Sequence, residues 1–262
     1  MSEVAEFKPK FIKVFNYSDE IKEIIEVDYT GFGRNGGRKG HKSSEVSEED
    51  RARNLKRVKR NVRRLAFSND LGQVHLVLTF AENVEDVDQA DQHFKIFMTN
   101  LHKFYPNLKY IATREIQKKR QEKYGVAVIH YHVLLNQRIN IKKTQKLWHH
   151  GFITLVQHKN KLKAVLYVLK YISKEVGETV FTTKNGHTKK AYLSSKGLKN
   201  DLDRCSTSFL INNPEAYIEY NDGINFMMTN LTEGWDIPFE LEIQGGKKIQ
   251  GRSILRCVAN NY

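Results

Sequence analysis

Hydrophobic and polar positions follow a regular pattern from about residue 73 onward. Short apolar, β-branched runs typical of strands occupy residues 74–80, 109–117, 126–135 and 152–157. Apolar residues at helical spacing occupy residues 86–105, 141–149 and 160–176. The predicted order is βαββαβα, an α+β fold in which helices cover one face of a sheet and leave the other for chemistry.

The two ends of the chain differ from this middle part. Residues 31–40 (GFGRNGGRKG) read as a flexible linker, and Ser47 with Asp50 resembles a capping box that begins a helix. Asn185-Gly186 and Asp222-Gly223 predict two hairpins after residue 176. We therefore predict an N-terminal extension over residues 1–70, a central domain over 71–200, and a C-terminal extension of unknown function over 201–262.

The composition favours a polyanionic partner, either nucleic acid or an acidic membrane. The 262 residues include 43 Lys and Arg against 30 Asp and Glu, a formal net charge of +13. Much of this charge lies on the helix that follows Ser47, whose apolar stripe is narrow. We predict that its basic residues contact the DNA backbone; the alternative is a solvated helix face. These residues are Arg51, Arg53, Lys56, Arg57, Lys59, Arg60, Arg63 and Arg64.

Several classes of protein do not fit the sequence. No run approaches the roughly 18 apolar residues of a membrane span, and the N-terminus lacks a signal-peptide pattern. Two cysteines make no disulfide framework. We expect reduced thiols and a cytoplasmic location.

Two histidines are the first candidates for chemistry. His130 and His132 lie one residue apart in a predicted strand, so both imidazoles point to the same face and could ligate a divalent metal. No Asp or Glu occurs between Lys123 and Lys174, so a carboxylate ligand must come from elsewhere. Glu115 in the preceding strand is the best candidate, although it could simply face solvent. Gln117 and Glu122, the latter in a predicted loop, are weaker ones.

Two tyrosines are the second candidates. Tyr167 and Tyr171 are four residues apart on a predicted helix, so their rings are neighbours on its polar side. Lys163, Lys170 and Lys174 gather on the same side. The alternative is a boundary position, with the ring packed and the hydroxyl in water. Together with a metal, a phenol could attack a phosphodiester, and nearby lysines would favour the phenolate.

The order of these motifs resembles that of the HUH endonucleases, and in particular the two-tyrosine rolling-circle replication initiators of bacterial phages and plasmids, including the gene II-like group. The resemblance is carried by His130-Tyr131-His132, followed by Tyr-x-x-Lys-Tyr-x-x-Lys over residues 167–174. The runs LVLTF (76–80), WHHGF (148–152) and SSKGL (194–198), and Glu115 with Gln117 and Arg120, are also similar to stretches of that family.

The resemblance implies a fold and an activity. It implies a five-stranded antiparallel, RRM-like sheet and nicking of single-stranded origin DNA that depends on Mg²⁺ or Mn²⁺. It further implies a 5′-phosphotyrosine link and strand joining, with His130, His132 and Glu115 as the metal ligands. No P-loop pattern occurs, so a helicase would come from the host.

Three other functions compete with this interpretation. An RRM-like binder would use the tyrosines as stacking platforms, but the RRM aromatic motif is absent. A cupin-type oxygenase or isomerase also uses His-x-His, but takes its carboxylate a few residues later, and here no acid follows before Glu175. A transposase of the HUH type shares the same chemistry and is the closest alternative.

Overall fold

A computed structural model gives the structure of the chain. It describes residues 8–17, 21–28, 47–177, 188–199, 206–211, 215, 239–243, 247–251 and 253–259. The chain divides into two compact units. One comprises residues 43–200, and the other comprises residues 1–42 together with 201–262.

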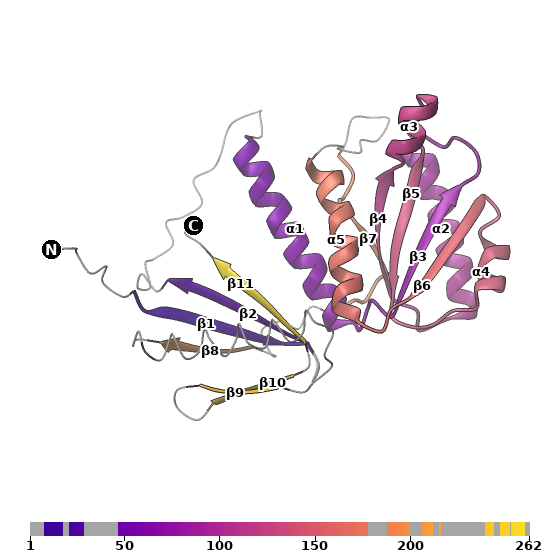
Figure 1. Cartoon of the computed structure of the whole chain (residues 1–262). Helices are drawn as coiled ribbons and strands as arrows, with labels where there is room; N and C mark the ends of the chain where they lie inside the picture. The colour runs from indigo at the N-terminus through magenta and orange to yellow at the C-terminus, as the bar shows by residue number, and fades with distance from the viewer. Residues whose placement is uncertain are drawn as a thin grey trace. The chain divides into compact units, whose positions relative to one another are not determined.

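A five-stranded antiparallel sheet forms the centre of the unit at residues 43–200 (Figure 1). Its strands lie in the order β6-β3-β5-β4-β7. They are β3 (Val74–Phe80), β4 (Tyr110–Ile116), β5 (Ile129–Leu135), β6 (Gly151–Gln157) and β7 (Leu193–Ser194). The α+β class and the five-stranded antiparallel sheet predicted from the sequence are confirmed.

Helices lie on both faces of this sheet. They are α1 (Glu48–Ser68), α2 (Val87–Phe104), α3 (Lys118–Tyr124), α4 (Ile141–Leu147) and α5 (Lys161–Gly177). On one face Phe94 of α2 stacks on Tyr131 of β5, with ring centroids 4.5 Å apart. On the other, α5 contacts β4 and β5 (Figure 1). The expectation of helices on one face alone is therefore incomplete, because α5 covers part of the second face.

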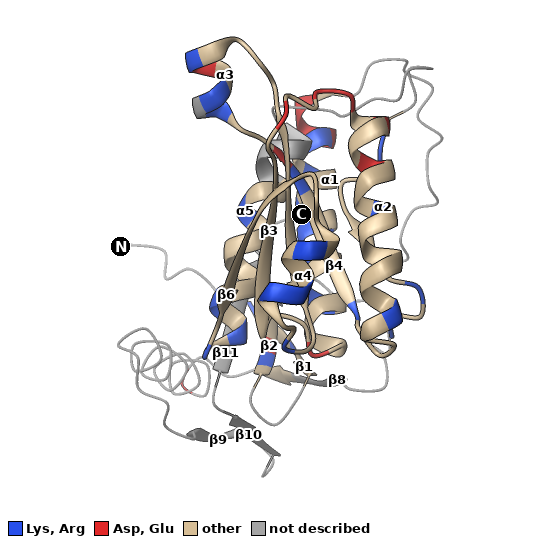
Figure 2. Cartoon of the chain, turned by 90° about the vertical axis from the view of Figure 1, so that its right-hand side faces the viewer, with Lys and Arg blue, Asp and Glu red and all other residues tan. Residues whose placement is uncertain are grey.

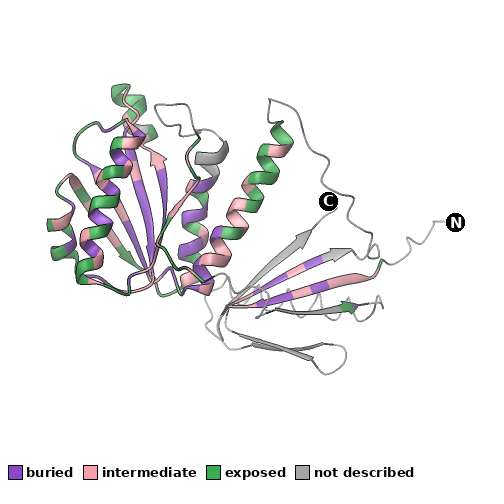
Figure 3. Ribbon diagram, turned by 180° about the vertical axis from the view of Figure 1, so that it is seen from behind, coloured by how far each residue is buried: buried purple, intermediate pink, exposed green. Residues whose placement is uncertain are grey.

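The main hydrophobic core fills the space between the sheet and α2. Four large aromatic side chains are almost completely buried there: Tyr131, Phe80, Phe97 and Trp148. Figure 3 shows the buried residues along the strands of the sheet. Phe104 also belongs to the predicted apolar stripe of α2, yet it is 56% exposed. The reason is that α2 ends at this residue, and the chain leaves the helix at Tyr105.

The helix α5 is buried on two sides because it packs against both the sheet and α1. Its buried residues include Val165, Leu169 and Ile172, as the sequence pattern predicts, together with Ala164 and Val168. The start of α1 also follows the sequence. The Ser47 side chain accepts a hydrogen bond from the Asp50 amide at 3.1 Å, which satisfies one of the free N–H groups of the first turn.

The connection between β4 and β5 differs from the expected loop. Residues 118–124 form the short helix α3, which ends at Gly125 in the left-handed conformation. Arg120 on this helix donates hydrogen bonds to the carbonyls of Phe80 and Ala81, at 3.1 Å and 3.0 Å. The loop prediction was wrong because Arg120 attaches these residues to the end of β3, about 40 residues earlier in the chain. A local sequence pattern does not reveal such a distant contact.

The short strand β7 is attached to the sheet through a buried ion pair. Arg114, 1% exposed, makes a two-pronged contact with Asp91 of α2 at 2.7 Å and 2.8 Å and also donates to the Lys190 carbonyl. Lys189 reaches the same carboxylate at 3.0 Å. Only two residues of β7 pair with β4. The charged contacts of Arg114 and Lys189 therefore help to hold β7 in place.

The second unit consists of strands from both ends of the chain. A four-stranded sheet has the order β11-β2-β1-β8, and β9 pairs with β10. The strands are β1 (Lys10–Asn16), β2 (Ile21–Asp28), β8 (Ser206–Ile211), β9 (Phe239–Ile243), β10 (Lys247–Gly251) and β11 (Ser253–Ala259). The predicted turns at 185–186 and 222–223 and the predicted linker at 31–40 lie outside the described residues.

Gly151 is expected to be the glycine of this sheet least able to accept a side chain. Its φ is +157°, and a β-carbon there would lie 2.2 Å from the Thr79 carbonyl oxygen. We expect Gly151→Ala to lower the free energy of unfolding by more than about 2 kcal/mol, because backbone atoms on β3 would have to move. Gly125→Ala is the control, since φ is +71° with no atom within 4 Å, and should cost about 1 kcal/mol. Equal destabilisation of the two variants in urea denaturation would contradict this.

Candidate active site

The register of three strands brings the predicted metal ligands to one face of the sheet. His130 lies between Thr79 on β3 and Glu115 on β4, and His132 lies opposite Thr113. Directly opposed residues of antiparallel strands point to the same face. The face that carries His130, His132 and Glu115 is therefore the one that α5 partly covers.

His132, Glu115 and the two tyrosines lie in direct contact. The Nε2 atom of His132 is 2.8 Å from the Oε2 atom of Glu115. The ring of Tyr171 stacks on the His132 imidazole, with centroids 3.6 Å apart and an interplanar angle of 10°. The Tyr171 hydroxyl donates a 2.6 Å hydrogen bond to the Tyr167 hydroxyl. The helix α5 thus places both phenols beside the histidine–glutamate pair.

Three buried polar atoms, on β5, on β4 and on the residue that follows β4, have no hydrogen-bond partner within the described structure. They are the His130 Nε2, the Gln117 Oε1 and the Thr113 Oγ1. A buried polar atom without a partner costs on the order of 1–3 kcal/mol, so such a group on one face indicates a place for a ligand. A lone-pair nitrogen with amide, hydroxyl and carboxylate oxygens suits a divalent cation. Among the described residues, no three His, Cys, Asp or Glu side chains already converge on one point.

The separation between His132 and Glu115 is also compatible with shared coordination. Two ligands on neighbouring corners of an octahedron with bonds of about 2.1 Å lie about 3 Å apart. The observed separation of 2.8 Å between His132 Nε2 and Glu115 Oε2 is close to that value. The spacing of this pair is therefore compatible with joint coordination of one divalent cation.

Sequence reasoning did not single out His75. It lies on β3, is 4% exposed, and its Nε2 is 3.2 Å from the Nδ1 of His132. It also meets the Tyr167 ring edge-on, with centroids 5.5 Å apart. The alternation of VHLVLTF places His75 on the same face as Val77 and Thr79. This alternation is the feature of the sequence from which His75 could have been predicted.

Burial favours the neutral form of two histidines on this face, His130 and His75. It lowers the pKa of His130 to about 4, with His132 adding to the effect, Glu115 opposing it and Arg120 adding to it. Burial, together with His132 and His158, lowers the pKa of His75 to about 3. Neutral imidazoles are the form that ligates metals.

The phenolate expected at Tyr171 is not favoured. Burial, the hydrogen bond to Tyr167 and the nearby carboxylate of Glu115 all raise the pKa of Tyr171. Burial above all, and then Tyr167 and Glu115, act against the ionisation that the lysines are expected to favour. A cation beside Glu115 would offset this negative charge.

Two of the three lysines predicted around the tyrosines are exposed on α5. Lys163 and Lys170 are exposed, and Lys170 Nζ lies 5.7 Å from the Tyr167 ring centroid. Lys174 belongs to α5, but its side chain lies outside the described part of the structure. The weaker ligand candidate Glu122 is exposed on α3, among the basic residues visible in Figure 2.

The basic residues of α1 fall into two groups. The first half of the helix presents Arg51, Arg53, Lys56 and Arg57 to solvent, and Arg53 pairs with Asp50 at 3.0 Å. The residues of the second half are half-buried; these are Lys59, Arg60, Arg63 and Arg64. The exposed half is therefore the part of α1 best placed to meet a polyanion.

Two runs that resemble family motifs have structural roles. Trp148 of WHHGF is buried and donates from its Nε1 to the Thr79 carbonyl at 3.1 Å. Ser194 of SSKGL belongs to β7, and Ser195 donates its amide to the Tyr110 carbonyl at 3.1 Å. Both runs help to build the sheet on which the site lies.

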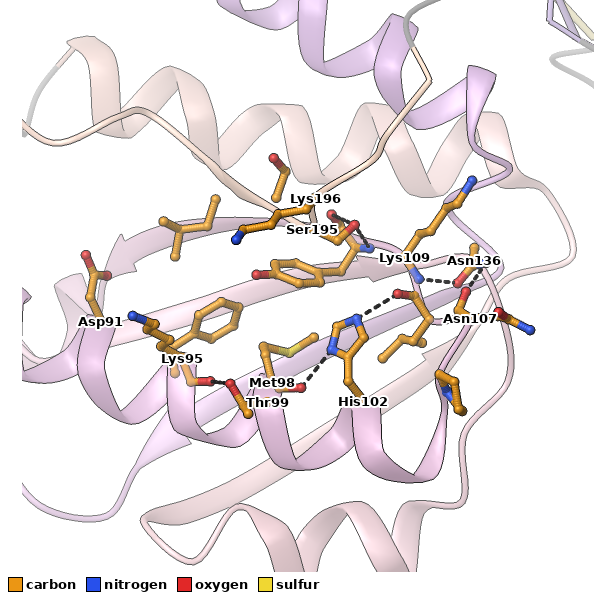
Figure 4. Close-up of a pocket in the computed structure, with 16 residues that line it drawn as sticks. Asp91, Lys95, Met98, Thr99, His102, Asn107, Lys109, Asn136, Ser195 and Lys196 are labelled. Atoms are coloured by element: carbon orange, nitrogen blue, oxygen red, sulfur yellow. Dashed lines mark hydrogen bonds between the residues drawn. The ribbon is translucent and has the colours of Figure 1, made fainter.

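A cavity of about 1090 Å³ is lined by none of the predicted site residues. It lies between α2 and the β7 segment, with an apolar lining that includes Phe94 and Met98 (Figure 4). There the His102 ring is held between the carbonyls of Met98 and Leu108, at 2.8 Å and 2.9 Å. The chemistry of the histidine–tyrosine face thus does not depend on this cavity.

Residues 73–176 match the model of a known protein family, described as the replication-associated protein ORF2/gene II protein family. The matched segment is therefore similar to replication-associated proteins of that family. It runs from β3 to α5 and includes Glu115, His130, His132, Tyr167 and Tyr171. The match fits a rolling-circle replication initiator, as predicted from the sequence, and supports a role in replication initiation.

The other comparisons add no relative to this replication-associated segment. No curated protein and no solved structure matches the chain. Among the described helices, none combines the length and the apolar character needed to cross a lipid bilayer.

The lowered pKa of His130 makes stability depend on pH. Between about pH 6.5 and 4 the unfolded chain binds a proton at this residue that the folded chain does not. In the presence of a chelator, the free energy of unfolding should therefore fall on acidification, with His130 contributing on the order of 2–3 kcal/mol. Urea denaturation across this range measures the effect. His130→Asn should flatten the pH dependence by that amount; an unchanged slope would contradict the assignment.

Proposed function

We propose that this protein nicks and rejoins single-stranded DNA at a replication origin, using a tyrosine as the nucleophile. The observation that carries the proposal is the stacking of Tyr171 on His132, with Glu115 on one side and the Tyr167 hydroxyl on the other. This arrangement places two phenol oxygens beside a donor set suited to a divalent cation. A metal ion and a nucleophile are the two parts that cleavage of a phosphodiester requires.

The proposed reaction conserves one phosphodiester bond. The phenol oxygen attacks the phosphorus, the bond to the 3′-oxygen breaks, and the proton lost by the phenol is balanced by one gained at the 3′-hydroxyl. The 5′-phosphate remains attached to the tyrosine. A 3′-hydroxyl can later reverse the step and join the strand. With two phenols 2.6 Å apart at their oxygens, the second can act while the first is esterified.

The proposed cofactor is Mg²⁺ or Mn²⁺, held by His130, His132 and Glu115. When bound, such a cation polarises the scissile phosphate and offsets the charge that develops on it. The exposed Lys163 and Lys170 lie on the same helix as the tyrosines and would contact neighbouring phosphates, with Lys174 as a further proposed contributor.

The uncovered part of the same face offers a path for the DNA strand. The helix α5 contacts β4 and β5, whereas β6 at the edge carries the exposed Phe152, Thr154 and Val156. Phe152 is opposite Thr79, which is itself opposite His130, so it shares the face of the histidines. An aromatic ring that is 68% exposed can stack on a base. The strand would thus approach the site across β6.

Removal of the two phenol oxygens tests the nucleophile. We expect Tyr167→Phe or Tyr171→Phe alone to impair strand transfer, and the double change to abolish covalent attachment, because no phenol then remains beside Glu115. The measurement uses labelled single-stranded DNA with Mn²⁺, followed by denaturing electrophoresis of the adduct and peptide mapping of the linked residue.

The same experiment separates the competing functions. A covalent adduct formed by the double variant would refute the tyrosine assignment. Binding of DNA by the unaltered chain with no adduct at any metal concentration would favour a non-catalytic RRM-like binder. Preference for hairpin element ends over origin sequences would favour a transposase of the HUH type.

Phe152 should contribute to binding of single-stranded DNA. Loss of a base-stacking aromatic costs about 1–3 kcal/mol, so Phe152→Ala should weaken the affinity at least fivefold in fluorescence anisotropy. The matched control is Phe104→Ala, because Phe104 is also exposed but belongs to α2, on the other side of the sheet. Equal affinities of the Phe152 and Phe104 variants would rule out the path across β6.

The exposed half of α1 should add an electrostatic contribution. Lys56→Gln with Arg57→Gln removes two exposed charges, and should reduce the slope of log affinity against log salt concentration by up to about 0.7 for each phosphate that these side chains neutralise. Lys95→Gln with Lys103→Gln on α2 removes the same charge from exposed positions elsewhere and serves as the control. Identical slopes for the two double variants would argue against a DNA contact at α1.

A further inference from the structure

His75 is a buried imidazole inside the proposed active site that the reaction above does not use. Its ring lies between those of His132 and His158, with centroids 5.3 Å and 6.1 Å away. Its Nε2 atom is 3.2 Å from the Nδ1 of His132. The other nitrogen of His132 is the one that faces Glu115. The two nitrogens of His132 are thus engaged by different partners.

The partners define where the protons lie when no cation is bound. A carboxylate oxygen only accepts, so a His132 ring that holds one proton carries it on Nε2 in the 2.8 Å hydrogen bond with Glu115. Its Nδ1 is then an acceptor. The contact of 3.2 Å with His75 can form only if His75 carries its proton on Nε2 and donates it.

The opposite arrangement is needed for ligation of a cation. A nitrogen that ligates a metal must offer its lone pair, so the proton of His132 moves to Nδ1. The same contact with His75 then persists only if His75 accepts through Nε2 and carries its own proton on Nδ1. Each imidazole keeps one proton throughout, so the exchange leaves the total number of bound protons unchanged.

We propose that His75 is a positioning residue that holds the His132 ring in place in both tautomers, donating to it without cation and accepting from it with cation. This inference rests on the proposed function, which assigns His132 as a ligand. Few side chains can fill the role at this buried place, because the group must be both a donor and an acceptor. Imidazole and the amide of glutamine meet the requirement, whereas an aliphatic side chain does not.

His75 also meets the Tyr167 ring edge-on, so its effect is not limited to the ligand. One buried side chain contacts the ring of a proposed ligand and the ring of a proposed nucleophile. A change at His75 should therefore shift the geometry of both halves of the site. His158 provides a matched control, since its ring also stacks against His75, with centroids 6.1 Å apart, whereas the hydrogen bond to His132 comes from His75.

The experiment compares the full chain with His75→Gln, His75→Leu and His158→Leu. Binding of Mn²⁺ is followed by electron paramagnetic resonance, and the tautomers are read from ¹⁵N NMR of the imidazoles with and without Mg²⁺. We expect His75 to carry its proton on Nε2 without metal and on Nδ1 with Mg²⁺. We expect His75→Leu to bind Mn²⁺ about 10–100-fold more weakly, and His75→Gln and His158→Leu to stay within about threefold of the unaltered chain.

Each alternative result has a definite meaning. Unchanged Mn²⁺ affinity in a folded His75→Leu, or a proton on Nδ1 of His75 without metal, would overturn the inference while leaving the proposed function intact. If His75→Leu does not fold, a His75→Gln variant that binds as weakly as His130→Ala would overturn it equally. If the unaltered chain binds no Mn²⁺ at all, the metal-dependent part of the proposed function fails, and the exchange of tautomers fails with it.

Discussion

The register between β4 and β5 is the constraint on which the rest of the site depends. It sets Glu115 opposite His130 and Thr113 opposite His132, and the alternation of side chains then puts all four on one face. A slip of one residue would turn every one of them to the other face, into the core beneath α2. The buried pair of Arg114 and Tyr131 points to that core, because both bond to Asp91 of α2. The two faces therefore hold each other in register.

The sheet divides its two faces between stability and chemistry. One face is packed against α2 and α4 with large aromatic and aliphatic side chains. The other carries histidines and a carboxylate, and several of its buried polar atoms have no partner within the described structure. Each buried polar group without a partner lowers the free energy of unfolding by on the order of 1–3 kcal/mol. The apolar face offsets this cost, so a polar face can exist beneath α5.

The helix α5 connects these parts because it is buried on two sides. Its apolar residues pack against the sheet and against α1, which leaves the tyrosines at the boundary where the polar face begins. Tyr171 is thereby stacked on His132, while Tyr167 remains 43% exposed. In the proposed function this difference matters, since a phenol that is open to solvent can meet a strand crossing β6, and a phenol on the histidine ring lies nearest the cation.

Local patterns in the sequence determined much of this protein. The alternation in VIHYHVLL and the helical spacing of Tyr167 and Tyr171 were sufficient to group the candidate residues by face, and the start of α1 follows from the Ser47 cap. What only the tertiary structure decided involves residues distant in the chain: His75 against His132, Arg120 on the end of β3, β11 beside β2, and α5 on a face expected to be bare. The physical reason is that periodicity reports which side of an element is apolar, whereas the partner of each side is set by packing across the whole unit.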